Sequence, residues 1–412
     1  MKSIYYFLSF LLFCNRLFAM VPDIVVDASG NGDFRTIQSA LDSHAMFPYQ
    51  RTVIYIRNGL YHEKIRIEKN YVTLAGESRD STIIEFSQKR ADWEKDKDFL
   101  GPAVVNIHAD DVVLENLTIR NSQQDTKVHA FTVYGTGTRT ILNHCNIVSR
   151  GGDTVSLWNY KTGMYYHSDC RFEGAVDFVC PRGWCFIRDS QFYEVRETAA
   201  LWHAGHFDQE QKLVIVNSYF DGVSGFHLGR HHYDAQFYFI RCQFSDNLAN
   251  KPIDWYLYED SKRNNPNQWG NRVYFYRCEK EGSKFDWMND NLPSNETLNE
   301  INANWTFQNK WAPEKEHQLE VCYYQINSSR LFLYFNEPVT VKGQPILVDE
   351  VGNKLPIAAQ RYLDIDCLEF IFSNLKKVDI NGNFAVNNGF LFPTKAYLHP
   401  CPLEEISIVK KK

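Results

Sequence analysis

A chain that repeats one short apolar pattern at a regular interval can bury that pattern only by stacking each repeat on the next. The middle of this sequence carries such a repeat: an apolar stretch, one small polar residue or Cys, and an apolar closure. The interval is irregular, about 20–28 residues. The segments that follow the pattern are Val113–Ile119, Ile141–Ile147, Met164–Phe172, Cys185–Phe192, Leu213–Phe220 and Phe237–Phe244, with Val273–Cys278 fitting in part. β-branched and aromatic residues dominate them, so we predict an all-β fold built on a right-handed parallel β-helix, a solenoid.

Both ends of the repeat differ from its middle. Phe34–His44 has the apolar spacing of a helix and is expected to cap the start of the solenoid, while 52–56 and 65–67 resemble strands. From about residue 319 the pattern changes to alternating strands separated by Gly and Asn turns, which indicates a small antiparallel β-sandwich. The predicted domains are 1–20, 21–315 and 316–412, and the role of the last is unassigned.

The first twenty residues resemble an export signal. Lys2 precedes a nearly continuous apolar run, Ile4–Cys14, and Ala19 ends a plausible cleavage region. The run is too short to cross a bilayer, and no later segment is long enough to do so. We therefore expect residues 1–20 to be a signal peptide, and the protein to be secreted or periplasmic with no membrane span.

Charge and cysteine content narrow the function classes. The net charge of −6 gives no basic excess for nucleic acid. Nine of the ten cysteines lie beyond the signal, an odd number that excludes complete internal pairing. Cys145, Cys170 and Cys242 fall at equivalent repeat positions, which predicts small buried side chains, and no metal-ligand cluster is recognisable. We expect a monomer.

Aromatic residues make up 15% of the chain. Two uses are open: filling the core of a β-rich fold, and stacking on flat ligands such as sugar rings. The first is expected for Phe172, Phe192, Phe220 and Phe244, which recur at one station of the repeat.

Two aspartates and an arginine carry the chemistry that the repeat makes possible. Asp153 and Asp177 are about one coil apart, so a β-helix would place them side by side on one face. Two adjacent carboxyl groups do not ionise equally, and such a pair can supply one acid and one nucleophile or base. Arg230 could hold the ionised partner by two hydrogen bonds. From spacing alone, a purely structural Asp–Arg pair remains the alternative.

An ordered set of motifs resembles the pectin methylesterase (pectinesterase) family over about residues 23–313. The opening IVVDASGNGDFRTIQSALDS and the GxYxE motif at 59–63 are similar to that family. Its QDT, VDFIFG and LGRPW motifs correspond to Gly152-Asp153-Thr154, to 176–181 (VDFVCP) and to 228–232 (LGRHH). A second QDT, at 124–126, lies before the His129 segment, in the wrong order, and is expected to be a loop.

The resemblance implies roles for these residues. Asp177 would attack the carbonyl carbon of a galacturonate methyl ester. Asp153 would protonate the leaving methoxide and then activate water, and Arg230 would orient Asp177 and keep it ionised. No metal or organic cofactor is implied. The implied partner is pectin or a related uronate polysaccharide, for which local basic residues such as Arg150, Lys161, Arg182 and Arg230 would offset the negative net charge.

The sequence departs from the family where the oxyanion would be bound. Two Gln side chains serve there in the family; His129 and Gly152 take their places. His129 could donate instead, or be a satisfied buried histidine. His231 and His232 replace the Pro and Trp after LGR, so sugar contacts would come from Trp158, Trp184, Trp202, His232 and Thr154, although each Trp could equally be core.

Three functions remain open. The first is an exported esterase that demethylates pectin. The second is an esterase acting on another pectic ester, either acetyl or in a branched region, and the third is a catalytically decayed glycan-binding protein. A polysaccharide lyase would need a Ca²⁺ cluster of carboxylates, and none is evident in the sequence.

Overall fold

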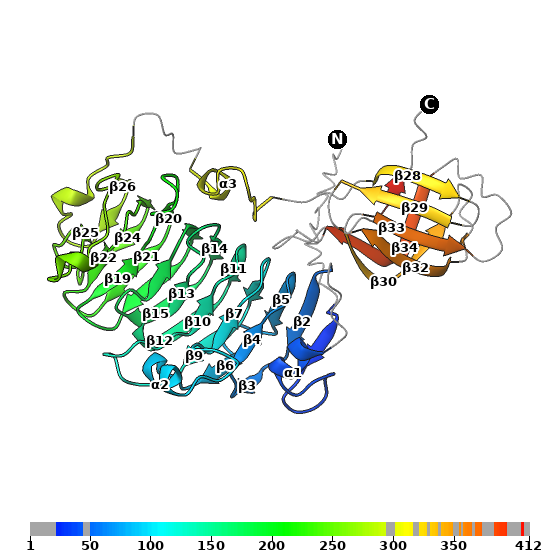
Figure 1. The fold of residues 1–412 in the computed structure, drawn as a ribbon, viewed down its shortest axis with the longest axis horizontal. Helices are drawn as coiled ribbons and strands as arrows, with labels where there is room; N and C mark the ends of the chain where they lie inside the picture. Colours follow the sequence, from blue (N-terminus) through cyan, green and yellow to red (C-terminus); the bar gives the residue numbers. More distant parts are fainter. Residues whose placement is uncertain are drawn as a thin grey trace, which may run out of the picture.

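The structure is a computed structural model. It describes residues 22–43, 50–293, 301–315, 321–327, 330–336, 339–348, 354–355, 357–364, 367–372, 383–393 and 405–407. The predicted signal peptide and two cysteines, Cys14 and Cys401, lie outside the described residues. Within them, no helix is both long and apolar enough to cross a membrane. The chain forms a long body of parallel strands followed by a smaller antiparallel part (Figure 1).

Three stacked parallel sheets form the long body, which confirms the predicted parallel β-helix. The ten-stranded sheet contains, in order, β1 (Ile24–Val26), β2 (Thr52–Ile56), β5 (Val72–Gly76), β8 (Val113–Glu115), β11 (Thr140–Asn143), β14 (Met164–Ser168), β17 (Trp184–Arg188), β20 (Leu213–Val216), β23 (Phe237–Ile240) and β26 (Val273–Tyr276). The eight-stranded sheet contains β25 (Asp254–Trp255), β22 (His227–His231), β19 (Ala199–Trp202), β16 (Val179–Pro181), β13 (Val155–Leu157), β10 (Val133–Gly135), β7 (Val105–Ile107) and β4 (Ile65–Ile67). The nine-stranded sheet contains β27 (Glu279–Lys280), β24 (Gln243–Phe244), β21 (Tyr219–Gly222), β18 (Gln191–Glu194), β15 (Arg171–Ala175), β12 (Asn146–Gly152), β9 (Thr118–Asn121), β6 (Thr82–Phe86) and β3 (Gly59–Tyr61).

The sequence repeat corresponds to the turn between the ten-stranded and nine-stranded sheets. One residue in each of these turns has a positive φ of 48–55°: Asn116, His144, Asp169, Asp189, Asn217, Arg241 and Arg277. Asn and Asp tolerate this left-handed conformation best. The residue that follows points inward, and it is Cys in four coils: Cys145, Cys170, Cys242 and Cys278. The predicted inward cysteines are therefore confirmed.

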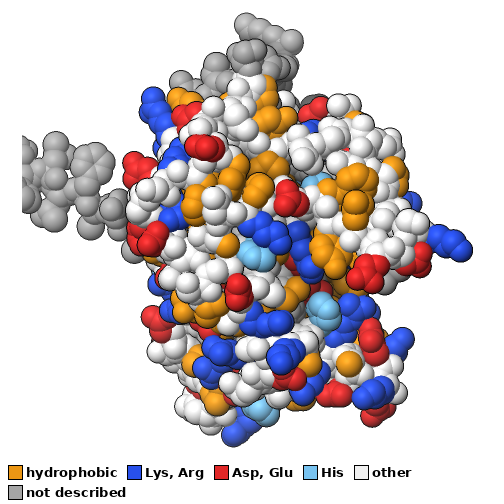
Figure 2. Space-filling view, turned by 90° about the vertical axis from the view of Figure 1, so that its left-hand side faces the viewer, with side chains coloured by type: hydrophobic (Ala, Val, Ile, Leu, Met, Phe, Trp, Pro, Cys, Tyr) orange, Lys and Arg blue, Asp and Glu red, His pale blue; other side chains and the backbone are white. Residues whose placement is uncertain are grey.

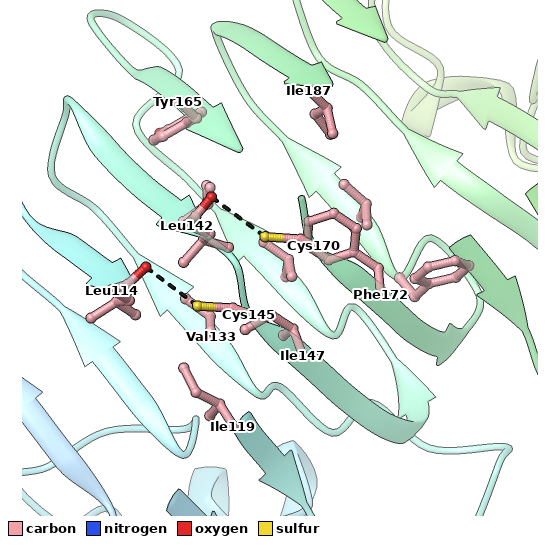
Figure 3. Packing of buried hydrophobic residues seen from close by; sticks show 14 of the residues in the cluster. Leu114, Ile119, Val133, Leu142, Cys145, Ile147, Tyr165, Cys170, Phe172 and Ile187 are labelled. Atoms are coloured by element: carbon pink, nitrogen blue, oxygen red, sulfur yellow. Dashed lines mark hydrogen bonds between the residues drawn. The ribbon is translucent and has the colours of Figure 1, made fainter. Parts of the chain in front are cut away.

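The buried thiols satisfy backbone carbonyls of the coil instead of pairing with one another. Cys145 Sγ donates to the carbonyl oxygen of Leu114 at 3.3 Å, and Cys170 Sγ donates to that of Leu142 at 3.4 Å (Figure 3). No disulfide joins the described cysteines, and seven of these eight residues are buried. They act as small hydrophobic residues with a weak donor, the role the sequence favoured.

Phenylalanine rings form the predicted stack inside the solenoid. Ring centroids of Phe172 and Phe192 lie 5.3 Å apart, those of Phe192 and Phe220 lie 4.2 Å apart, and those of Phe220 and Phe244 lie 5.2 Å apart. Each ring comes from the same register position of β15, β18, β21 and β24. Much of the aromatic content is thus core.

The two ends of the solenoid are covered. Helix α1 (Ile37–Asp42) confirms the predicted cap, and the Glu63 carboxylate accepts hydrogen bonds from the backbone N–H groups of Ile37 and Gln38. In the same motif, Tyr61 donates its hydroxyl to the carbonyl of Arg57 at 2.9 Å, so the GxYxE sequence holds the cap in place. At the other end the 3₁₀ helix η2 (Asp286–Met288) buries Met288. Helices α2 (Arg90–Lys95) and α3 (Ala303–Thr306) lie on the outside of the coils, and a second 3₁₀ helix, η1, spans Ser261–Arg263.

The C-terminal part has two four-stranded antiparallel sheets, as the predicted sandwich requires. One contains β28 (Val321–Asn327), β29 (Arg330–Phe335), β33 (Cys367–Phe372) and β32 (Ile357–Asp364); the other contains β31 (Lys354–Leu355), β30 (Val339–Val348), β34 (Asn383–Pro393) and β35 (Glu405–Ser407). The backbone N–H of Arg51 donates to Thr340 Oγ1 at 3.1 Å, which links this part to the β-helix near β2.

Candidate active site

The three residues singled out for chemistry meet on the eight-stranded sheet. Asp153 lies between β12 and β13, Asp177 lies two residues before β16, and Arg230 belongs to β22. The backbone N–H of Asp153 donates to the carbonyl of Val176 at 3.1 Å, so the two aspartates occupy successive coils. The predicted side-by-side placement results from the parallel register in which Val155 pairs with Val179.

The backbone at both aspartates is left-handed. Asp153, Val176 and Asp177 have φ values of 56°, 39° and 55°. Asp accepts this conformation at modest cost, but a β-branched residue such as Val176 is a true outlier there. The Asp177 N–H donates to the carbonyl of Ala199 at 2.6 Å, which ties the strained turn to the next coil.

Arg230 grips Asp177 with two parallel hydrogen bonds. Its Nε donates to Oδ1 at 2.9 Å and its Nη2 donates to Oδ2 at 2.7 Å. Burial raises the pKa of Asp177 to about 6; Arg230 opposes that rise and Asp153 adds to it. The guanidinium also lies over the ring of Tyr256, 5.2 Å from its centroid, so its position is fixed from both sides.

His129 lies against the other aspartate. Its Nδ1 is 3.3 Å from Asp153 Oδ2, and half of its side chain is exposed. The hydrogen bond with Asp153 raises the pKa of the imidazole, burial and Arg90 act against the rise, and Asp177 adds to it. The histidine is therefore part of the same ionic cluster as both aspartates, rather than a satisfied buried residue.

These side chains line an open cleft of about 280 Å³. Trp158, Trp202 and His232 form its aromatic walls, as the sequence led us to expect. The Arg182 guanidinium lies over Trp158 at 4.4 Å and over Trp202 at 5.5 Å. The remaining lining residues are Cys180, Tyr233 and Tyr258, with His129, Asp153, Asp177 and Arg230 at the centre.

Residues 23–205 match the sequence model of a family described as pectinesterase, and this segment includes both aspartates and His129. Over this segment the chain is similar in sequence to the pectinesterase family.

Similarity to individual pectinesterases is distant. Probable pectinesterase 67 of Arabidopsis thaliana is 22% identical over 318 residues, which cover 70% of this chain and 85% of that protein. Putative pectinesterase 11 of the same plant is 34% identical over 161 residues, covering 38% of this chain and 42% of that protein. The chain spans about half the length of pectinesterases 31 and 56 (50% and 54%).

Solved pectin methylesterases share the fold. A pectin methylesterase in complex with a hexasaccharide has a TM-score of 0.59 at 22% identity, and the match covers 72% of this chain and all of that one. The pectin methylesterase PemA from Erwinia chrysanthemi gives a TM-score of 0.58, also at 22% identity, covering 72% of this chain and 99% of that one. The β-helix is the part that these structures have in common with this chain.

Two of the residues predicted to contact sugar, Trp184 and Thr154, do not line this cleft. Trp184 begins β17 of the ten-stranded sheet and packs at 5% exposure in an outer apolar cluster, with Lys310 over its ring. Thr154 is fully buried, and its hydroxyl donates to the carbonyl of Gly151. Trp184 belongs to a different sheet from the residues of the cleft, and the Thr154 side chain is turned into the interior. The QDT at 124–126 lies between β9 and β10, in the loop expected for it.

Basic side chains flank the cleft, though not all of those expected. Arg182 and Arg230 line it, whereas Arg150 lies on β12 and Lys161 lies over the rings of Tyr160 and Phe207. Two adjoining cavities, of about 380 and 170 Å³, contribute cations that sequence reasoning missed: Lys251 in the first, and Arg66 and Arg90 in the second. Seen from the end that carries β25, Lys, Arg and His side chains are interspersed with hydrophobic patches (Figure 2).

A buried carboxyl group beneath the site was also missed. Glu194 ends β18 with its side chain in the interior, fully buried. Its Oε1 accepts from the backbone N–H of Arg196 at 3.0 Å, while Oε2 has no hydrogen-bonding partner among the described residues. Burial raises its pKa to about 9, and Asp177 contributes to the rise. The alternation of β18, with outward Gln191 and Tyr193, was the signal that could have identified it.

Replacing Glu194 by Gln is expected to make stability less dependent on pH. The folded-state pKa is raised, so wild-type stability is greatest below the ordinary Glu pKa and is lost as pH rises towards about 9. A neutral amide removes that loss, and the variant should be more stable than wild type by a few kcal/mol near about pH 8, with little difference at about pH 5. Denaturant unfolding at both pH values measures this. Glu197→Gln, at an exposed position, should show no such gain; an equal effect of Glu194→Gln at both pH values would contradict the assignment.

Proposed function

We propose that the protein is an exported esterase that hydrolyses methyl esters of pectin, giving galacturonate and methanol. The observation that carries this proposal is the buried Asp177 carboxylate, held by two hydrogen bonds from Arg230, beside Asp153 in an aromatic cleft. A related structure with a similar β-helix binds a hexasaccharide, which supports a polysaccharide substrate. Export rests on the signal-like residues 1–20.

The first step is nucleophilic. One Asp177 oxygen attacks the ester carbonyl carbon, and the tetrahedral intermediate collapses by breaking the bond to the methoxy oxygen. Arg230 favours the ionised form of Asp177 and fixes which oxygen faces the cleft. The product of this step is a mixed anhydride between Asp177 and the galacturonate carboxyl, together with methanol once the leaving oxygen has gained a proton.

The second step is hydrolysis of that anhydride. Water attacks the galacturonyl carbon, and the Asp177 carboxylate leaves. A group beside Asp177 must supply the proton for methoxide and take one from water, and the family resemblance gives this part to Asp153. This division of labour needs two carboxyl groups with different protonation, and the buried, Arg-bound Asp177 and the His-bound Asp153 provide unlike surroundings.

An acidic polymer needs cations along the cleft. Arg182 is held between two tryptophan rings and makes no ion pair with a described carboxylate. It is placed to offset the carboxylate of a neighbouring galacturonate while the Trp faces contact the sugar ring. This local positive charge offsets the repulsion between an anionic polymer and a protein of net charge −6.

A second candidate is hydrolysis of another pectic ester, acetyl or in a branched region. His129 and Gly152 in place of the family's two Gln, and His232 in the cleft wall, favour this alternative. The third candidate is a glycan-binding protein that has lost catalytic activity, and the intact Asp177–Arg230 ion pair argues against this candidate.

The experiment is an ester panel. We expect methanol release from methylated pectin at a saturable rate, faster than acetate release from acetylated pectin. A preference for acetyl esters would select the second candidate. Tight binding of pectin without turnover of any ester would select the third.

A further inference from the structure

We propose that His129, which is hydrogen-bonded to Asp153, donates the proton to the leaving alkoxide and then accepts one from water. The absence of a side chain at Gly152 leaves the space that the imidazole occupies. This inference rests on the proposed function, because it assigns the acid–base part of that reaction to a particular imidazole. It goes beyond the family resemblance, in which Asp153 itself is the acid.

Gly152 and His129 are in contact through the backbone as well as the side chain. The two residues form a parallel bridge, in which the Gly152 N–H donates to the carbonyl of Val128 at 2.8 Å and the Ala130 N–H donates to the carbonyl of Gly152 at 3.0 Å. A Cβ placed on Gly152 would lie 3.2 Å from His129 Nδ1, and also 3.1 Å from the carbonyl oxygen of Val176. A longer side chain at 152 would therefore compete with the imidazole for one space. His129 and Gly152 are one matched replacement for the two family Gln residues.

The partner of Nδ1 determines what the other nitrogen can do. Nδ1 lies 3.3 Å from Asp153 Oδ2, an arrangement that keeps a proton on Nδ1 and leaves Nε2 for chemistry. Nε2 has no hydrogen-bonding partner among the described residues, and half of the side chain is exposed on the cleft. A carboxylate that orients a histidine and stabilises its cation is a known way to make an imidazole an effective acid and base.

The charged groups around the ring favour the cation. Asp153 lies on one side and Asp177 on the next coil, while Arg90 of α2 opposes them. The Arg90 backbone N–H also donates to the carbonyl of His129 at 2.9 Å, which fixes the segment from outside the sheet. The net effect of these groups and burial raises the pKa of His129. A protonated imidazole next to an ionised Asp177 is the state that the first step needs.

The proton balance closes over one cycle. As the carbon–oxygen bond to methoxide breaks, the Nε2 proton passes to that oxygen, giving methanol and neutral imidazole. The other ring proton stays on Nδ1, where it is hydrogen-bonded to Asp153. Water then gives a proton to Nε2 as its oxygen bonds to the galacturonyl carbon and the bond to Asp177 breaks. The imidazolium and the Asp177 carboxylate are restored, and the new galacturonic acid releases its proton to solvent.

Asp153→Asn separates this inference from the alternative in which Asp153 is the acid. If His129 carries the proton, the variant keeps measurable kcat, but the alkaline limb of its kcat–pH profile moves to lower pH because the imidazole loses the carboxylate that raised its pKa. If Asp153 is itself the acid, the variant loses the acid and no shifted limb is seen. The latter result would overturn the inference.

His129→Gln provides the second measurement. We expect a fall in kcat of about 10²–10⁴-fold and the disappearance of the alkaline limb. His144→Asn is the matched control: His144 Nδ1 lies 2.5 Å from Asp169 Oδ2, a second His–Asp pair on an outer turn, and Asn suits its positive φ. This control should leave kcat and the profile unchanged. Gly152→Ala should lower kcat by crowding the ring, and it should also lower the unfolding temperature, because the added Cβ approaches the carbonyl oxygens of Val176 and Ala175 at 3.1 and 3.3 Å.

The outcomes distinguish two failures. Wild-type protein that releases no alcohol from any ester refutes the proposed function and this inference with it. Wild-type hydrolysis with an alkaline limb that survives unchanged in His129→Gln refutes this inference alone.

Discussion

Asp177→Asn is expected to lower methanol release from methylated pectin by about 10³-fold or more, since removal of a nucleophile usually costs at least that much. The amide has the size of the carboxylate and still lies against Arg230, but it cannot form the anhydride. In wild-type protein the same group should set the acidic limb of the rate profile: activity falls as pH drops through the Asp177 pKa of about 6. Initial rates of methanol release across pH measure both effects.

Asp189→Asn is the control for this substitution. Asp189 lies on an outer turn with φ of 51°, where Asn is well tolerated, and its carboxylate pairs with Arg188 at 2.6 Å, away from the cleft. Its rate should equal that of wild type. If Asp177→Asn keeps the wild-type rate while both variants fold, another residue is the nucleophile.

Phe192→Ala should lower the free energy of unfolding by about 3–5 kcal/mol, as expected for a large ring removed from a packed core. The ring is stacked on Phe220 at 4.2 Å and contacts Phe172 and Phe178, so neighbours on two coils lose their partner at once. Urea unfolding followed by tryptophan fluorescence measures the change.

Tyr193→Ala tests whether the effect comes from the stack. Tyr193 is the next residue of β18, is 36% exposed and faces outward, so its loss should cost less than about 1 kcal/mol. Equal destabilisation by the two variants would show that the loss comes from changing β18 itself and not from removing a ring of the stack.

The repeating features of the β-helix could be predicted from the sequence. Parallel stacking places equivalent residues of successive coils directly above one another. One such position is marked by Cys145, Cys170 and Cys242, and another by the row of phenylalanines. The placement of Asp153 beside Asp177 follows from the same rule. In each case residues one coil apart in the sequence lie side by side in the structure, so the spacing in a single sequence is enough to predict the contact.

Relations that depend on side-chain direction were not accessible in this way. Trp158 lines the cleft and Trp184 does not, although both end or begin apolar stretches, because Trp158 follows β13 of the eight-stranded sheet and Trp184 begins β17 of the ten-stranded sheet. The contact of His129 with Asp153 depends on a bridge between segments that no apolar period marks. Lys251 and Arg90 come from connections whose paths are set by packing, not by local pattern.

The left-handed residues that close each coil have a consequence for variation. Because register is fixed at those turns and by the inward side chain that follows, the connections around the eight-stranded sheet can change in length without moving the strands that hold Asp153, Asp177 and Arg230. Doubling a flexible connection costs only about 0.6 kcal/mol in closure entropy. The connection 256–272, which contributes Tyr258 to the cleft wall, is thus free to diverge, and substrate range can be altered there while the nucleophile keeps its place.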